Sequence, residues 1–271
     1  MSDGASDGRP TELPSTLRRA CLAGALVALV VALVPPLSGA ARRIEYAQAL
    51  QFSLLGMVVP ALATAGAPWR RLRLASRSTT DTPPQTVDRL AQSRRRHREL
   101  SRSLAFIAVD VAVIIAWHTP VAVTAAARHV WLLPVEAVTL LVFGVGLWLE
   151  LVQSPPLAPR SGHLRRAVLA ALVMWALWIL AYVAGMSNHD FYSNFHHAAG
   201  DLSAAADQQI ASAVLWLVSA VTFVPVIFWN ALMWLKTEDD PDTELIGLLR
   251  AERRRGAPPL AGGGDGGMPA R

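Results

Sequence analysis

The sequence predicts an all-α integral membrane protein, a bundle of about six transmembrane helices. Hydrophobic residues make up 53% of the 271-residue chain, which also contains nine tryptophans. This composition is too apolar for a soluble domain of that length. A hydrocarbon core of about 30 Å needs about 20 mostly apolar residues per helix. Six stretches meet this requirement: 18–37, 44–65, 103–125, 130–152, 166–186 and 208–235.

The first stretch has two interpretations. Arg18 and Arg19 precede an apolar run that ends near the small residues at 38–40. That order fits a transmembrane helix and also fits a cleavable signal peptide. The other five helices keep the same orientation in either case.

The later stretches each contain a feature that breaks the apolar pattern. The second opens with Glu45 and Gln48, and the third carries Asp110 and His118 before Pro120. The fourth holds Glu136 near its start and Glu150 near its end, the fifth follows Arg165 and begins with Arg166, and the sixth follows Asp207. A proline ring cannot donate a backbone hydrogen bond, so we expect a kink in the third helix.

Charge predicts the orientation, because positive residues stay on the cytoplasmic side of short loops. With both termini inside, 22 of the 25 Lys and Arg residues are cytoplasmic, and only Arg42, Arg43 and Arg128 lie outside. The basic residues flank the spans, which favours contact with anionic lipid headgroups over binding of nucleic acid. The predicted parts are a disordered cytoplasmic N-terminus (1–17), the membrane domain (18–236) with a basic cytoplasmic loop (67–102) and an extracytoplasmic loop (187–207), and a cytoplasmic tail (237–271) that is Pro/Gly-rich at its end.

The outer face gathers the candidate site residues. His118 and Glu136 lie near the outer ends of their helices, and the loop at 187–207 lacks Lys and Arg. Ionisable residues inside a membrane segment mark functional positions by default. Histidine and carboxylate donors suit copper or zinc. The candidate metal ligands are therefore His118, Glu136, His196, His197 and Asp207.

Each candidate also has a structural interpretation. His118 precedes Pro120 and could bond to a backbone carbonyl that the proline frees, while Asp207 could cap the helix that it begins. Glu136 needs a partner at its depth, and we expect His118, Arg128 or His129.

Two further carboxylates lie deeper in the membrane segments. Asp110 is expected to be protonated or to pair with Asn230, and Glu150 to snorkel toward Arg165 or Arg166.

Machinery for soluble-enzyme catalysis is absent from the sequence. Cys21 is the only cysteine, so no disulfide can form within the chain. We find no phosphate-binding glycine loop, nucleophile elbow or zinc-protease helix. A non-enzymatic role follows.

Several ordered landmarks resemble those of the CtaG-type assembly factors of haem-copper (cytochrome c) oxidases. The similar positions are Gln51 to Pro60 and Gly66-Ala67-Pro68; Trp117-His118-Thr119-Pro120; Glu136, Gly144 and Trp148; Pro155-Pro156-Leu157; and Asp207-Gln208-Gln209 with Trp216. The resemblance runs from about Tyr46 to Trp234. It implies a multi-pass protein of a bacterial-type plasma membrane that helps to place copper in the oxidase.

The chain departs from that family pattern at four positions. Members usually carry histidines where this sequence has Gln48, Phe52, Leu133 and Ala137. Because imidazole is a common metal donor and these side chains are not, the departures argue against direct copper binding.

The resemblance and the residues together predict an assembly factor without catalysis of its own. Its outer face would dock oxidase subunits or a copper donor protein, with Gln48, Trp117, Pro120, Gln208, Gln209 and Trp216 as motif or partner contacts. The alternative is a small ion-coupled transporter that uses Asp110, His118 and Glu136 as its path. Membrane haem binding is weaker, because only His118 lies inside a helix.

Overall fold

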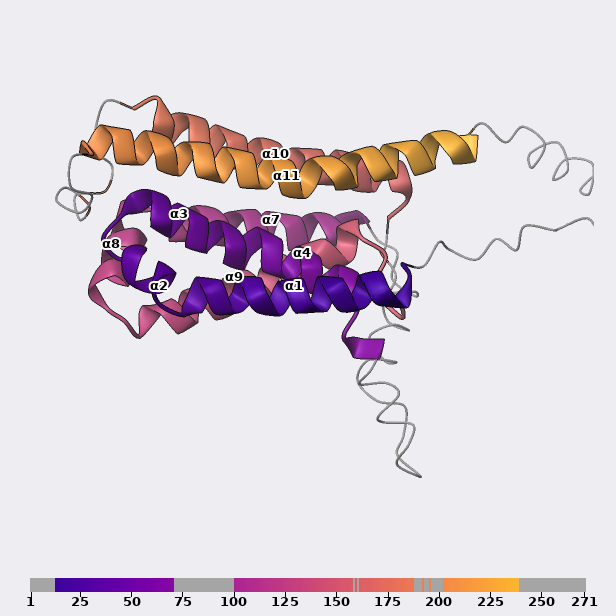
Figure 1. The fold of residues 1–271 in the computed structure, drawn as a ribbon. Helices are drawn as coiled ribbons and strands as arrows, with labels where there is room; N and C mark the ends of the chain where they lie inside the picture. Colours follow the sequence, from indigo (N-terminus) through magenta and orange to yellow (C-terminus); the bar gives the residue numbers. More distant parts are fainter. Residues whose placement is uncertain are drawn as a thin grey trace, which may run out of the picture. The chain divides into compact units, whose positions relative to one another are not determined.

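The computed structural model is all-α in the residues that it describes, which are 13–70, 100–157, 159, 161–187, 192, 195 and 202–238. The chain divides into two compact units, Met1–Ala231 and Leu232–Arg271. All features described below belong to the first unit unless stated otherwise. The helices are α1 (Ser15–Leu33), α2 (Leu37–Ala40), α3 (Glu45–Ser53), η1 (Leu54–Val58), α4 (Val59–Gly66), α7 (Leu100–Trp117), α8 (Pro120–Arg128), α9 (Leu132–Leu151), α10 (His163–Gly185) and α11 (Ala204–Glu238), as Figure 1 shows.

The predicted set of membrane spans is confirmed. Five helical segments are long and apolar enough to cross a membrane, namely α1, α3 to α4, α9, α10 and α11. The pair α7 and α8 passes the same test as one span that is bent by 64°. The protein is therefore a multi-pass membrane protein. The predicted terminal segments and most of the basic loop lie outside the described residues.

The second span contains a π-helical turn, η1, which ends two residues before Pro60. Proline cannot donate to the carbonyl four residues earlier, and a π turn is one way a helix absorbs that loss. Helix α9 packs against this turn through Gly144. A Cβ atom at Gly144 would lie 2.7 Å from Cγ of Pro60 and 2.9 Å from the carbonyl oxygen of Gly56. Only a glycine fits at this contact.

The first span packs along α4. A Cβ atom at Gly66 would lie 2.5 Å from Cγ of Leu22, so the two helices approach closely there. At the other end of α1, the buried Gln51 amide donates to the carbonyl of Ala32 at 2.6 Å. This bond joins α3 to the last turn of α1.

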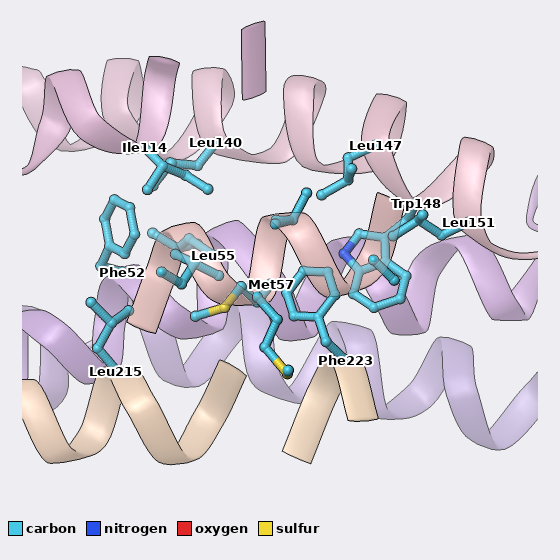
Figure 2. Packing of buried hydrophobic residues seen from close by; sticks show 14 of the residues in the cluster. Phe52, Leu55, Met57, Ile114, Leu140, Leu147, Trp148, Leu151, Leu215 and Phe223 are labelled. Atoms are coloured by element: carbon cyan, nitrogen blue, oxygen red, sulfur yellow. The ribbon is translucent and has the colours of Figure 1, made fainter. Parts of the chain in front are cut away.

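The core lies between the spans and is made of apolar side chains that come mainly from α3, η1, α7, α9, α10 and α11 (Figure 2). Trp148 stacks on Phe223 with a centroid distance of 5.0 Å. Both side chains are almost fully buried, as are Phe52, Leu55 and Leu140. This packing fixes the helix faces that carry the polar residues.

Candidate functional site

The third span is broken at His118 and Thr119. We predicted one continuous helix over 103–125 with a kink; instead α7 ends at Trp117 and α8 begins at Pro120. Thr119 is extended, as expected for a residue before proline. Its hydroxyl donates to the Ala116 carbonyl at 2.8 Å and accepts from the Ala122 amide at 3.4 Å. The side chain thus closes one helix and caps the next.

His118 is held by two contacts of its ring and one of its backbone carbonyl. Its Nδ1 lies 3.0 Å from the carbonyl oxygen of Ile114, which can only accept, so Nδ1 carries the proton. The ring packs edge-on against Phe52 of α3 at a centroid distance of 4.1 Å. The Tyr192 hydroxyl donates to the His118 carbonyl at 2.9 Å. In the neutral ring, Nε2 is the nitrogen that remains available.

Tyr192 belongs to the predicted outer loop, 74 residues away from His118 along the chain. Burial, with a further contribution from the Glu45 carboxylate, raises the pKa of Tyr192 to about 12. The phenol therefore keeps its proton at neutral pH and serves as a hydrogen-bond donor. Phe195 of the same loop is also buried.

Glu136 lies in α9 and is 5% exposed. It lines a cavity of about 30 Å³ together with Arg42, Gln48, Gln51 and Phe195, which is room for about two water molecules. The expected partners His118, Arg128 and His129 make no hydrogen bond to its carboxylate within the described part of the chain. The guanidinium of Arg42 instead donates to the carbonyl of Ala127, with Nη2 at 3.1 Å.

Asp207 caps a helix other than the one that we predicted. It lies in the first turn of α11, but its carboxylate accepts from the amides of Glu45 and Tyr46 at 2.9 and 3.0 Å. Those amides are the first two of α3. The neighbouring Gln208, predicted to be a motif or partner contact, donates from Nε2 to the Ala184 carbonyl at the end of α10, at 2.6 Å. Two adjacent residues of α11 therefore hold the start of one span and the end of another.

The other motif residues divide into two groups. Trp117 donates to Thr139 at 2.9 Å and joins α7 to α9 below His118, and Pro120 begins α8. Gln209 and Trp216 lie on an exposed face of α11, where they line an apolar groove with α10 rather than the Glu136 cavity. The structure therefore does not bring these two residues into the candidate site.

The profile of the cytochrome c oxidase caa3 assembly factor family, Caa3_CtaG, matches residues 5–237. The chain belongs to this family. No curated protein and no solved structure matches it. Membership of an assembly-factor family indicates a non-catalytic role and an interaction with oxidase components.

The four positions at which this family member departs from the expected histidine pattern are close to His118 and Glu136. Gln48 and Leu133 line the Glu136 cavity. Phe52 contacts the His118 ring, and Ala137 is buried next to Glu136 in α9. These four positions therefore carry amide and apolar groups rather than metal donors at one place in the fold.

The described residues do not fit a copper site. No three His, Cys, Asp or Glu side chains among them lie close enough to hold a metal ion. The Asp207 carboxylate and the Nδ1 atom of His118 are already committed to backbone groups. His196 and His197, the remaining candidate ligands, lie outside the described residues.

One of the two alternatives expected for Asp110, the pairing with Asn230, is not found among the described residues. Asn230 does not pair with Asp110, because it accepts from Nδ1 of His163 at 3.1 Å and donates to the carbonyls of Val226 and Leu151. Glu150 is fully buried and accepts from the Ser103 hydroxyl at 2.8 Å. Asp110 is 3% exposed, and its Oδ2 atom has no hydrogen-bond partner in the described structure.

The sequence analysis missed Tyr192 and Phe195, and it treated Gln51 only as part of a family landmark. Tyr192 and Phe195 are aromatic residues three apart in a loop that also contains many polar residues. That contrast was the available signal, because apolar rings in a polar loop usually pack on the adjoining structure.

Proposed function

We propose that this family member supports maturation of the oxidase copper centre at the extracytoplasmic face. It does so by docking an oxidase subunit or a copper donor protein over the Glu136 cavity, without holding the metal itself. The observation that carries the proposal is the convergence of Glu136, Gln48 and the His118–Phe52 pair at one end of the bundle. The predicted topology places that end outside.

The cavity favours a protein contact over a small-molecule substrate. Sites for small molecules usually enclose about 300–1,000 Å³, and this cavity has a volume of about 30 Å³. Arg42 and Val130 line it and are also exposed. A partner that contacts Arg42 and Val130 therefore lies directly above the buried carboxylate of Glu136. No described residue donates a hydrogen bond to this carboxylate.

The alternative of an ion-coupled transporter has less support. Such a path needs its ionisable groups in one continuous cavity. Neither Asp110 nor His118 is among the described residues that line the Glu136 cavity.

The proposal is tested by complementation of a deletion strain. We expect Glu136→Gln and Arg42→Ala to lower oxidase subunit content and haem-copper absorption several-fold, because they remove the acceptor and the rim cation. Asp110→Asn is the matched control, since it neutralises an equally buried carboxylate away from the cavity. Immunoblots confirm equal amounts of each variant in the membrane.

Normal oxidase in the deletion strain would reject the assembly role. Loss of function in Asp110→Asn equal to that in Glu136→Gln would favour the transporter. Copper analysis of purified wild type and His118→Ala after copper loading separates docking from carriage, and we expect both proteins to remain metal-free. Stoichiometric copper in the wild type that disappears in the variant would show direct binding.

A further inference from the structure

An apolar groove of about 640 Å³ lies between α10 and α11, away from the Glu136 cavity. Its walls are aromatic, with Trp175, Trp178 and Tyr182 from α10 and Trp216 from α11. The small residue Ala213 leaves the space open between them. Both helices are membrane spans, so the groove opens toward the bilayer.

The aromatic wall is rigid and its polar atom is satisfied. Trp178 stacks on Trp216 at a centroid distance of 5.1 Å and 30° between planes. Its indole N–H donates to the Ser219 hydroxyl at 3.0 Å. Because this hydrogen bond fixes the ring, the groove exists before any ligand enters, which lowers the entropic cost of binding.

The two helices meet closely at the outer end of the groove. A Cβ atom at Gly185 would lie 2.9 Å from Cβ of Ser212. The Ser212 hydroxyl donates to the carbonyl of Gln208 at 2.9 Å. The polar side chain left at this end is Gln209, which is exposed. The groove is thus apolar along its length and polar at one end.

The length of the groove matches one leaflet. Its lining on α10 extends from Trp175 to Met186, which is about 16 Å at 1.5 Å per residue. Half of a hydrocarbon core of about 30 Å is about 15 Å. A transmembrane helix of a partner would pack along α10 and α11 across both leaflets. An acyl chain of a lipid lies within one leaflet, as the groove does.

We propose that this groove binds one acyl chain of a phospholipid from the leaflet in which α10 ends and α11 begins. In the predicted topology this is the outer leaflet. The headgroup lies beside Gln209, and the chain extends along the three tryptophans. This inference is independent of the role in oxidase maturation.

Native mass spectrometry of the full chain, after exchange into micelles that contain dioleoyl phosphatidylcholine, tests the proposal. We expect the wild type to retain one phospholipid that Ala213→Phe loses at least several-fold, because the new ring fills the groove. The matched control is Ala108→Phe, the same change at an exposed position of α7 that does not line the groove. Equal retention in all three proteins would overturn the proposal.

A second measurement does not depend on the folding of a variant with a bulky ring. A photoreactive residue in place of Ala213, activated in intact membranes, should cross-link to phospholipid. Cross-linking to an oxidase subunit instead would show that a protein helix occupies the groove, and would reject the lipid assignment.

Discussion

At the residue scale, polar side chains in this protein mainly complete the backbone hydrogen bonds of neighbouring helices. Gln51 donates to Ala32, Gln208 donates to Ala184, and His118 bonds to Ile114. Each accepting carbonyl lies in the last turn of a helix. Because the bilayer offers no water to such groups, each unsatisfied one costs several kcal/mol. A polar residue in a membrane segment can therefore be essential without touching any ligand.

Asp207 allows a direct test of this view. We expect Asp207→Ala to lower the free energy of unfolding by about 2–4 kcal/mol, because it orphans two buried amides at the start of α3. Asp207→Asn keeps one acceptor oxygen and should lose less. Thermal unfolding of the purified protein in detergent measures both effects.

The nearby Ile210→Ala is the control, since that position of α11 is 40% exposed. A melting temperature for Asp207→Ala equal to that of Ile210→Ala would contradict the capping role.

The partner of Asp207 could not have been predicted from the sequence. The motif Asp-Gln-Gln indicates a helix start, and a helix does begin at Ala204. The amides that Asp207 accepts from are 161 and 162 residues away, and only the packing of α11 on α3 brings them together. The sequence likewise predicted that Glu136 lies within a membrane segment, but it could not predict the cavity beside this residue.

At the scale of elements, two irregular segments shape the site. The π turn at Leu54–Val58 and the break between α7 and α8 both accompany a proline. Pro120 predicted a kink, but the 64° bend also reflects tertiary contacts, such as the hydrogen bonds from Arg42 to Ala127 at the end of α8. The position of a proline in the sequence therefore predicts where a helix bends, but it does not predict the bend angle.

The contact between the π turn and α9 predicts a position-specific effect of added volume. Gly144→Ala should destabilise the protein by about 1–3 kcal/mol, because the new methyl group meets Pro60 and the Gly56 carbonyl. Gly39→Ala makes the same change in α2, where nothing lies within 4 Å of the added atom. We expect its melting temperature in detergent to be unchanged. Equal effects of the two substitutions would refute the packing argument.

At the scale of the whole molecule, composition and hydropathy were sufficient to predict the all-α class and the membrane spans. The hydrophobic length required by a bilayer is a strong constraint, so these features depend little on tertiary detail. Orientation depends on the distribution of Lys and Arg, which predicts both termini inside.

Cysteine labelling tests the orientation. With Cys21 replaced by serine, Arg43→Cys should react with a membrane-impermeant maleimide in intact cells, and Lys236→Cys should react only after the cells are opened. Both positions are exposed, so access by reagent is not limited by burial. The reverse pattern would invert the topology and place the Glu136 cavity at the inner face.

The contacts of Asp207 and Gln208 have a consequence for biogenesis. Because α11 follows α3 and α10 in the chain, the ribosome delivers it after both have already been made. Until then, the first amides of α3 and the last carbonyls of α10 lack the partners that α11 supplies. A nascent chain halted before residue 204 would expose these groups, which gives membrane quality control a chemical mark of incomplete synthesis.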